Sequence, residues 1–127
     1  MFHLGKHLKT NAGDLPLGYK QRLALSCAIM HNPAVLFLDE PTSGVDPLTR
    51  REFWNHINVL AGKGVTIMVT THFMDEAEYC DRISLFYQGQ AIATGSPDEL
   101  KHSVSAAATM EDAFISLIEN FDAKATA

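Results

Sequence analysis

Two adjacent carboxylates directly follow a short apolar run of the sequence. Residues 35–38 are all apolar and lead into Asp39 and Glu40. Such a run is typical of a strand that is covered on both faces. Adjacent acids at a strand end suit metal-assisted nucleotide hydrolysis, in which the Asp binds Mg²⁺ through water and the Glu takes a proton from the attacking water. The pair alone also fits a strand that ends in two solvated acids.

A tight polar loop and a helix follow the two acids. Residues 41–46 read Pro-Thr-Ser-Gly-Val-Asp, and Asp46 is followed by Pro47. An Asp before a proline predicts a helix that is capped by the Asp and has the proline at its first position. The residues expected on the buried face of this helix are Phe53, Ile57 and Leu60.

A second strand and a histidine come next. Residues 65–70 are rich in β-branched side chains, which predicts a buried strand, and His72 stands just beyond it. A strand, a helix and a strand in this order form a right-handed crossover, so the two strands are expected to be parallel. Ligand chemistry gathers at the carboxyl ends of parallel strands, so we expect His72 to lie at the same edge as Asp39 and Glu40.

A helix is also expected before the first strand. Residues 15–22 read Leu-Pro-Leu-Gly-Tyr-Lys-Gln-Arg, and apolar residues at helical spacing continue to about His31, before Asn32 and Pro33 end the helix. The expected buried face of this helix carries Leu23, Cys27 and Met30.

Together these segments resemble the ATP-binding subunit of ABC transporters, from about residue 15 to about residue 100. The resemblance implies that Asp39 is the Walker B aspartate at Mg²⁺ and that Glu40 is the catalytic glutamate. It further implies that Asp46 is the D-loop aspartate facing a second nucleotide-binding domain, and that His72 is the switch histidine at the γ-phosphate.

The segment at residues 15–19 stands where this family has its signature motif, Leu-Ser-Gly-Gly-Gln. A helix N-terminus, a hydroxyl and glycine amides there bind the γ-phosphate held by the partner domain. Here Pro16 replaces the serine and Leu17 the first glycine, so two donors are lost while Gly18 remains. A core helix that starts at a proline is the alternative for Pro16 and Leu17. The resemblance makes these five residues candidate nucleotide contacts: Leu15, Pro16, Leu17, Gly18 and Tyr19.

The sequence contains no P-loop, which needs Gly, four residues, and Gly-Lys-Ser/Thr. The expected fold is therefore an α/β fragment: part of a P-loop NTPase-like, mainly parallel sheet flanked by helices, with a C-terminal hairpin and helices. We expect the C-terminal half of one nucleotide-binding domain. Its parts would be 1–31 (end of the helical subdomain with the signature motif), 32–103 (Walker B, D-loop and switch histidine) and 104–127 (linker and closing helix).

The rest of the chain predicts a hairpin and two helices. The hairpin would turn at Gln88-Gly89, and Ser96 and Glu99 form a capping box. Residues 110–121 form a helix with a broad apolar stripe, which we interpret as core, with a docking face as the alternative. Residues 71–83 and 109–114 resemble the drug-export branch of the family. They are also similar to a ribosome-associated ABC ATPase of bacteria.

Composition narrows the choice of partners. The 127 residues carry a formal net charge of -5 with scattered Lys and Arg, which argues against direct DNA binding. Two cysteines fit buried thiols better than a disulfide or zinc site. No signal peptide or membrane span is visible. The resemblance implies ATP and Mg²⁺ as cofactors and a location at the cytoplasmic side of the inner membrane, through a transmembrane permease.

Two further classes compete with a part of an export ATPase. One is a degenerate, regulatory ATPase-derived module, with the ribosome as a candidate partner. The other is a chromosome-maintenance ATPase, which would need coiled-coil heptads that the sequence lacks. We expect the isolated chain to be inactive, because the phosphate-binding P-loop is not among its residues.

Overall fold

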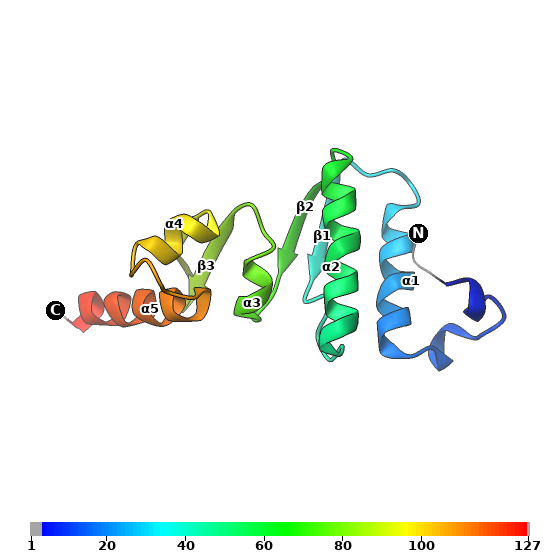
Figure 1. Cartoon of the computed structure of the whole chain (residues 1–127), viewed down its shortest axis with the longest axis horizontal. Helices are drawn as coiled ribbons and strands as arrows, with labels where there is room; N and C mark the ends of the chain where they lie inside the picture. Colours follow the sequence, from blue (N-terminus) through cyan, green and yellow to red (C-terminus); the bar gives the residue numbers. More distant parts are fainter. Residues whose placement is uncertain (1–3, 127) are drawn as a thin grey trace. The chain divides into compact units, whose positions relative to one another are not determined.

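The computed structural model describes residues 4–126, which divide into two compact units, one up to Thr70 and the other from Thr71 (Figure 1). Each unit contains a two-stranded sheet. None of the helices in this part of the chain is long and apolar enough to cross a membrane.

The first unit contains a parallel strand pair and two helices. After short 3-10 turns at Gly5–His7 and Ala12–Asp14, its elements are α1 (Leu17–Ile29), β1 (Val35–Asp39), α2 (Pro47–Gly62) and β2 (Thr66–Thr70). The strands pair in register from Val35 with Thr66 to Asp39 with Thr70. The expected parallel crossover is therefore confirmed.

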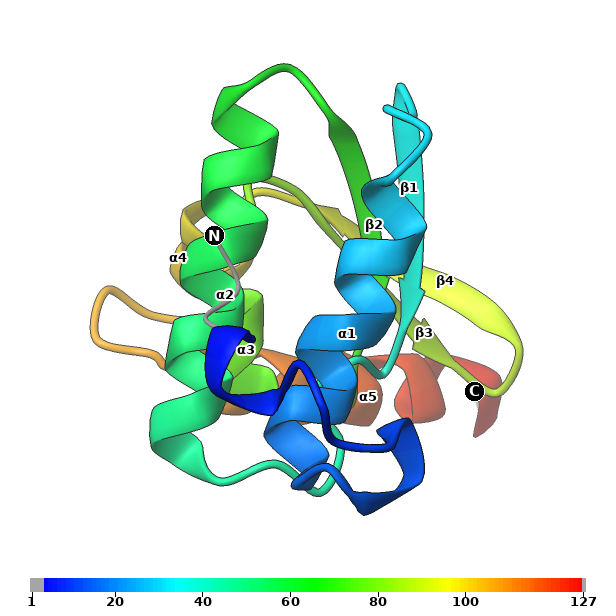
Figure 2. The ribbon, with the colours of Figure 1, turned by 90° about the vertical axis from the view of Figure 1, so that its right-hand side faces the viewer.

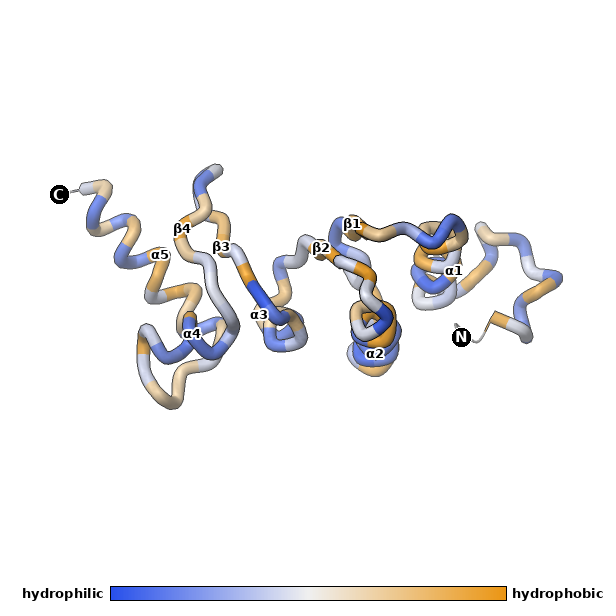
Figure 3. Tube along the Cα trace, turned by 90° about the horizontal axis from the view of Figure 1, so that it is seen from above, coloured by the Kyte–Doolittle hydropathy of each residue, from blue (hydrophilic) through white to orange (hydrophobic). Residues whose placement is uncertain are grey.

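Helix α2 covers one face of this sheet (Figure 3). Its buried residues are Phe53, Trp54, Ile57 and Leu60. Side chains alternate along a strand, so Leu36 is buried while Phe37 is 73% exposed. The expectation that both strands are covered on both faces is wrong for the described residues, because the face that carries Val35, Phe37 and Met68 has no element packed over it within this unit.

Helix α1 has the expected bounds but a different buried face. Arg22 and Leu25 are buried, whereas Met30 is 79% exposed and Cys27 is exposed. The predicted face was wrong because the guanidinium of Arg22 forms an ion pair with the Glu52 carboxylate of α2, which turns that side of α1 inward. An ion-paired arginine on a buried helix face does not follow an apolar pattern.

The second unit packs three helices against a hairpin. Its elements are α3 (Met74–Ala77), β3 (Ile83–Tyr87), β4 (Gln90–Gly95), α4 (Pro97–His102) and α5 (Met110–Thr126). The hairpin turns through Gln88 and Gly89, both with positive φ, as a type I′ turn requires. The Ser96–Glu99 capping box is present. The core consists of Ala77, Leu85, Leu100 and Met110.

The apolar stripe of α5 belongs to the core only in part. Phe114 and Leu117 pack against the core cluster of the second unit, although Ile115 is 49% exposed. Both cysteines are free thiols. Burial, with Asp81 and Glu76 nearby, raises the pKa of the Cys80 thiol, so that group stays protonated at neutral pH. The expected burial of both thiols is wrong for Cys27, which is exposed, and is met only partly by Cys80, which is half-buried.

Candidate functional site

Asp39 and Glu40 lie at the carboxyl end of β1, where both form hydrogen bonds with Thr70 of β2. The Thr70 hydroxyl donates a hydrogen bond to Asp39 Oδ1. The Glu40 backbone N–H is directed to the Thr70 carbonyl oxygen at 2.9 Å and to its Oγ1 at 3.1 Å. One threonine therefore orients the Asp39 carboxylate and fixes the backbone of Glu40.

Sequence reasoning did not single out Thr70. The structure reveals its role, because the two parallel strands end at Asp39 and Thr70, which are partners in the register. A hydroxyl at that position is the side chain within reach of the first acid.

Glu40 has an uncommon backbone conformation. Its φ is 42°, in the left-handed region that glycine favours and that costs other residues about 1 kcal/mol or more. Both Asp39 and Glu40 are exposed. Residues held in such conformations cluster at active sites, so the backbone independently marks Glu40 as a functional candidate.

The loop between Glu40 and α2 is short and ordered by its own backbone. Ser43 N–H donates to the Glu40 carbonyl at 3.2 Å, and Val45 N–H donates to the Thr42 carbonyl at 3.1 Å. The Thr42 side chain is 1% exposed, and Gly44 has a φ of +78°. This loop delivers Asp46 to the start of α2.

Asp46 is the N-cap of α2. Its Oδ2 accepts a hydrogen bond from the Thr49 N–H at 3.1 Å, and Pro47 holds the first helical position, as expected. Hydrogen bonds from the Thr49 side chain and backbone hold the pKa of the Asp46 carboxyl below its ordinary value. The carboxylate thus has a local structural role, besides any contact with a partner domain.

This cap predicts an acid-sensitive contribution to stability. Because the pKa of the Asp46 carboxyl is lower in the folded than in the unfolded chain, its ionised form stabilises the fold at pH values above the unfolded pKa of about 3.9. This contribution is lost as the pH falls through the folded pKa. We expect Asp46→Ala to lower the free energy of unfolding at pH 7, and Asp46→Asn, also a good cap, to retain most of it. Urea unfolding between pH 7 and pH 3 should show the wild type losing its advantage over Asp46→Asn; a constant difference would contradict the cap.

The start of α1 packs against the start of α2 and the loop before it (Figure 2). Pro16 is the N-cap of α1 and forms no side-chain capping bond. A Cβ placed on Gly44 would lie 3.1 Å from Leu17 Cδ2. Leu17 therefore fills space beside the loop, where the family motif has glycine.

Gly18 of α1 lies close to Thr49 in the first turn of α2. A Cβ built on Gly18 would lie 2.5 Å from Thr49 Cγ2. The absence of a side chain at position 18 thus lets α1 approach the first turn of α2, whatever other role Gly18 has.

This approach predicts a rescue experiment. Gly18→Ala should destabilise the chain by about 1–3 kcal/mol through overpacking, since threonine is stiff at χ1. In a Thr49→Ser background, which removes Cγ2, the same change should be nearly neutral. Gly13→Ala is the matched control because nothing lies within 4 Å of its Cβ position. Equal losses from Gly18→Ala with and without Thr49→Ser, measured by urea unfolding, would refute the contact.

The other two signature positions have structural surroundings of their own. Leu15 is 7% exposed and belongs to the core of the first unit. The Tyr19 ring lies 4.3 Å from the His7 ring, with the Lys6 ammonium and the Arg22 guanidinium each 5.0 Å from its centroid. That residues 15–19 contact nucleotide stays a prediction.

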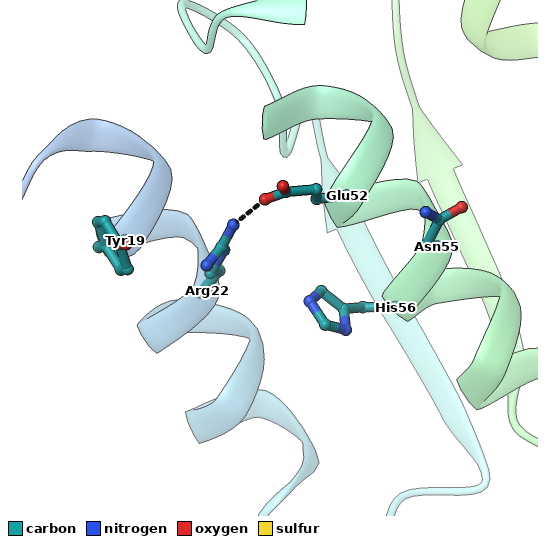
Figure 4. Close-up of a pocket in the computed structure, with 5 residues that line it drawn as sticks. All are labelled: Tyr19, Arg22, Glu52, Asn55 and His56. Carbon is teal, nitrogen blue, oxygen red and sulfur yellow. Dashed lines mark hydrogen bonds and ion pairs between the residues drawn. The ribbon is translucent and has the colours of Figure 1, made fainter. Parts of the chain in front are cut away.

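An open cavity of about 370 Å³ lies between α1 and α2 (Figure 4). Its lining residues are Tyr19, Arg22, Glu52, Asn55 and His56. The Arg22 side chain extends across the cavity to Glu52. The guanidinium and the carboxylate that line the cavity form an ion pair with each other. The cavity is thus distinct from the acids at the end of β1.

His72 is the second residue of the second unit and stands two positions after Thr70. Thr71 on one side of it donates a hydrogen bond from Oγ1 to Glu76 Oε2 at 2.7 Å, and Phe73 N–H on the other side donates to Thr71 Oγ1 at 3.1 Å. The His72 and Phe73 rings are 4.3 Å apart. The structure brings together Asp39, Glu40, Asp46, Leu17 and Gly18 at one end of the first unit, and the meeting of His72 with them stays a prediction.

Asp39 and Glu40, at the carboxyl end of β1, could bind a magnesium ion only together with ligands from outside this cluster. Mg²⁺ is usually bound by one or two carboxylates together with waters and substrate phosphates, so a single exposed Asp39, oriented by Thr70, matches that requirement. The described residues contain no group of three or more His, Cys, Asp or Glu side chains that could hold a metal by themselves.

The parallel strands, the crossover helix and the flanking helices match part of a nucleotide-binding domain. Residues 1–73 match the family described as "AAA domain, putative AbiEii toxin, Type IV TA system", and the chain belongs to that family. Its curated relatives are ATP-binding proteins of ABC transporters, and its structural neighbours are ABC ATPase domains, so the chain is similar to part of such a protein.

Two curated relatives illustrate this similarity. The chain is 64% identical over 122 residues to the "Probable multidrug ABC transporter ATP-binding protein YbhF" of Escherichia coli (strain K12), which covers 92% of this chain and 21% of that protein. It is 47% identical over 92 residues to the "Nod factor export ATP-binding protein I" of Burkholderia orbicola (strain AU 1054). That alignment covers 72% of this chain and 30% of the relative. The chain therefore spans about a fifth to a third of these relatives.

Solved structures support the same fold. An "ATP binding subunit of ABC transporter" superposes with a TM-score of 0.77 at 28% identity, over 92% of this chain and 50% of that one. A nucleotide-free ATP-binding cassette from an ABC transporter gives a TM-score of 0.76 at 30% identity, over 84% and 43%. The expected α/β fold, a partial nucleotide-binding domain, is confirmed.

Proposed function

We propose that this chain is the C-terminal half of one nucleotide-binding domain in an ABC-type ATPase that powers export across a membrane. The observation that carries the proposal is the strand-end cluster of Asp39, Glu40 and Thr70, beside the starts of α1 and α2. Its similarity to ATP-binding proteins of ABC transporters supports the same assignment. The division into 1–31, 32–103 and 104–127 is part of this proposal.

Each acid has a distinct role in this reaction. Asp39, oriented by the Thr70 hydroxyl, binds the water shell of Mg²⁺. Glu40 accepts a proton from the water that attacks the γ-phosphate, and the pinned backbone of Glu40 limits where its carboxylate can reach. Bound Mg²⁺ supplies charge neutralisation for the phosphates.

His72 and the first unit's loop complete the site in the whole protein. His72 donates to a γ-phosphate oxygen and thereby senses the third phosphate. Asp46 contacts a second nucleotide-binding domain in a head-to-tail dimer, and residues 15–19 face the nucleotide of that partner. Leu17 lies against Gly44 and Gly18 against Thr49, so these two contact segments lie side by side.

ATP hydrolysis would drive a transmembrane permease, which is either a domain of the same protein or a separate subunit. The chain would act at the cytoplasmic side of the inner membrane through that permease. The relatives named for multidrug transport and for Nod factor export favour export as the direction.

A second candidate is a degenerate, regulatory ATPase-derived module, with the ribosome as its partner. Pro16 favours it, because the N-cap of α1 has no side-chain capping bond where the family places a serine hydroxyl. In that case the signature segment would serve as a packed helix start.

Calorimetry tests the division of labour between this chain and the rest of its protein. We expect no ATP binding in the micromolar range by the isolated chain, since no P-loop is among its residues, and micromolar binding by the whole protein with Mg²⁺. Micromolar affinity in the isolated chain would refute the proposed half-domain. A whole protein that binds ATP without hydrolysing it would favour the regulatory module.

A further inference from the structure

Glu76 is a buried acid that the proposed reaction does not use. Its side chain belongs to α3, and the residue is 1% exposed. Burying a polar group costs about 1–3 kcal/mol unless it is hydrogen-bonded. The Glu76 carboxyl meets that requirement through the Thr71 hydroxyl at 2.7 Å.

The same hydroxyl shapes the backbone around His72. Thr71 Oγ1 accepts the Phe73 N–H at 3.1 Å while it donates to Glu76 Oε2. Thr71 and Phe73 flank His72, so the two hydrogen bonds close a turn around it. The Glu76 N–H donates to the Phe73 carbonyl at 3.1 Å, which ties the far side of the turn to α3.

Helix α3 is itself anchored in the core of the second unit. Ala77 is a member of the core cluster, and Met74 packs against it. Glu76 therefore links a fixed core to the turn that carries His72. Supporting hydrogen bonds of this kind hold functional side chains in productive geometry.

We propose that Glu76, acting through the Thr71 hydroxyl, is a positioning residue for His72. The inference rests on the proposed ATPase function, in which His72 meets the γ-phosphate. Glu76 touches neither nucleotide nor water in this role; it fixes the backbone from which the imidazole extends.

The kinetic test uses the whole protein and isosteric variants. Thr71→Val, which keeps the shape and removes the hydroxyl, should lower kcat for ATP hydrolysis about 10- to 100-fold with little change in KM. Thr71→Ser should retain most of the activity. Glu76→Gln should fall between them, and the double variant Thr71→Val/Glu76→Gln should be no worse than Thr71→Val, because both act through one hydrogen bond. Additive losses, or a loss in Thr71→Ser equal to that in Thr71→Val, would overturn the proposal.

A second readout separates this inference from the proposed function. In the 127-residue chain, Thr71→Val should speed amide hydrogen exchange at Phe73 and shift the NMR signals of His72, while Thr71→Ser leaves both close to wild type. Unchanged exchange and shifts in Thr71→Val would overturn the positioning role. If the whole wild-type protein shows no ATP hydrolysis, the proposed function fails, and the exchange result still decides whether Thr71 and Glu76 fix the turn.

Discussion

Replacing Glu40 by Gln is expected to lower ATP hydrolysis by the whole protein about 100- to 10,000-fold, the range typical of a lost general base. The amide keeps the size of the side chain but cannot accept the proton of the attacking water. The Glu40 N–H bonds to Thr70 are made by the backbone, so they should survive the change. ATP binding should therefore persist, and steady-state hydrolysis with parallel calorimetry measures both.

The matched control is Glu119→Gln, the same change at an exposed position of α5. It should leave hydrolysis unchanged. If Glu40→Gln retained more than about a tenth of the wild-type rate, the assignment of Glu40 as general base would fail.

The second large effect is expected at His72. His72→Ala should reduce kcat about 100- to 1,000-fold, the cost of removing one donor that stabilises developing charge. Because the imidazole acts on the γ-phosphate, the affinity for ADP should stay close to wild type. Steady-state hydrolysis and ADP titration provide the two measurements.

His102→Ala serves as the control for this substitution, since His102 is an exposed residue in α4. A loss of ADP binding as large as the loss of kcat would show that His72→Ala disturbs the fold, and an unchanged kcat would exclude His72 from the reaction.

Local signals in the sequence predicted much of the fold correctly. The crossover between β1 and β2, the turn at Gln88-Gly89 and the Ser96 capping box all follow from residue types at fixed positions. These features depend on neighbouring residues and on chirality, so a single sequence carries them.

Features that depend on packing partners were harder to predict. The apolar run in β1 suggested cover on both faces, yet Phe37 is 73% exposed in the described unit. The buried face of α1 includes Arg22, whose partner Glu52 lies thirty positions away in the sequence. Neither burial follows from local periodicity, because each depends on what is packed against the element.

The candidate site shows the same division. The sequence singles out Asp39, Glu40 and His72 through residue types at strand ends. It did not single out Thr70 or Glu76, which act through hydrogen bonds to other side chains. Supporting residues of this kind require the register of the strands and the path of the turn, which the structure supplies.

We expect Asp39, Glu40 and His72 to converge on the terminal phosphate of one nucleotide. A crystal structure of the whole protein carrying Glu40→Gln, with ATP and Mg²⁺, tests it most directly. Asp39 should then contact the water shell of Mg²⁺. The side chain of residue 40 and the His72 imidazole should both lie within hydrogen-bond reach of the γ-phosphate or its attacking water. An ordered ATP with the His72 imidazole on the opposite side of the sheet from residue 40 would contradict it.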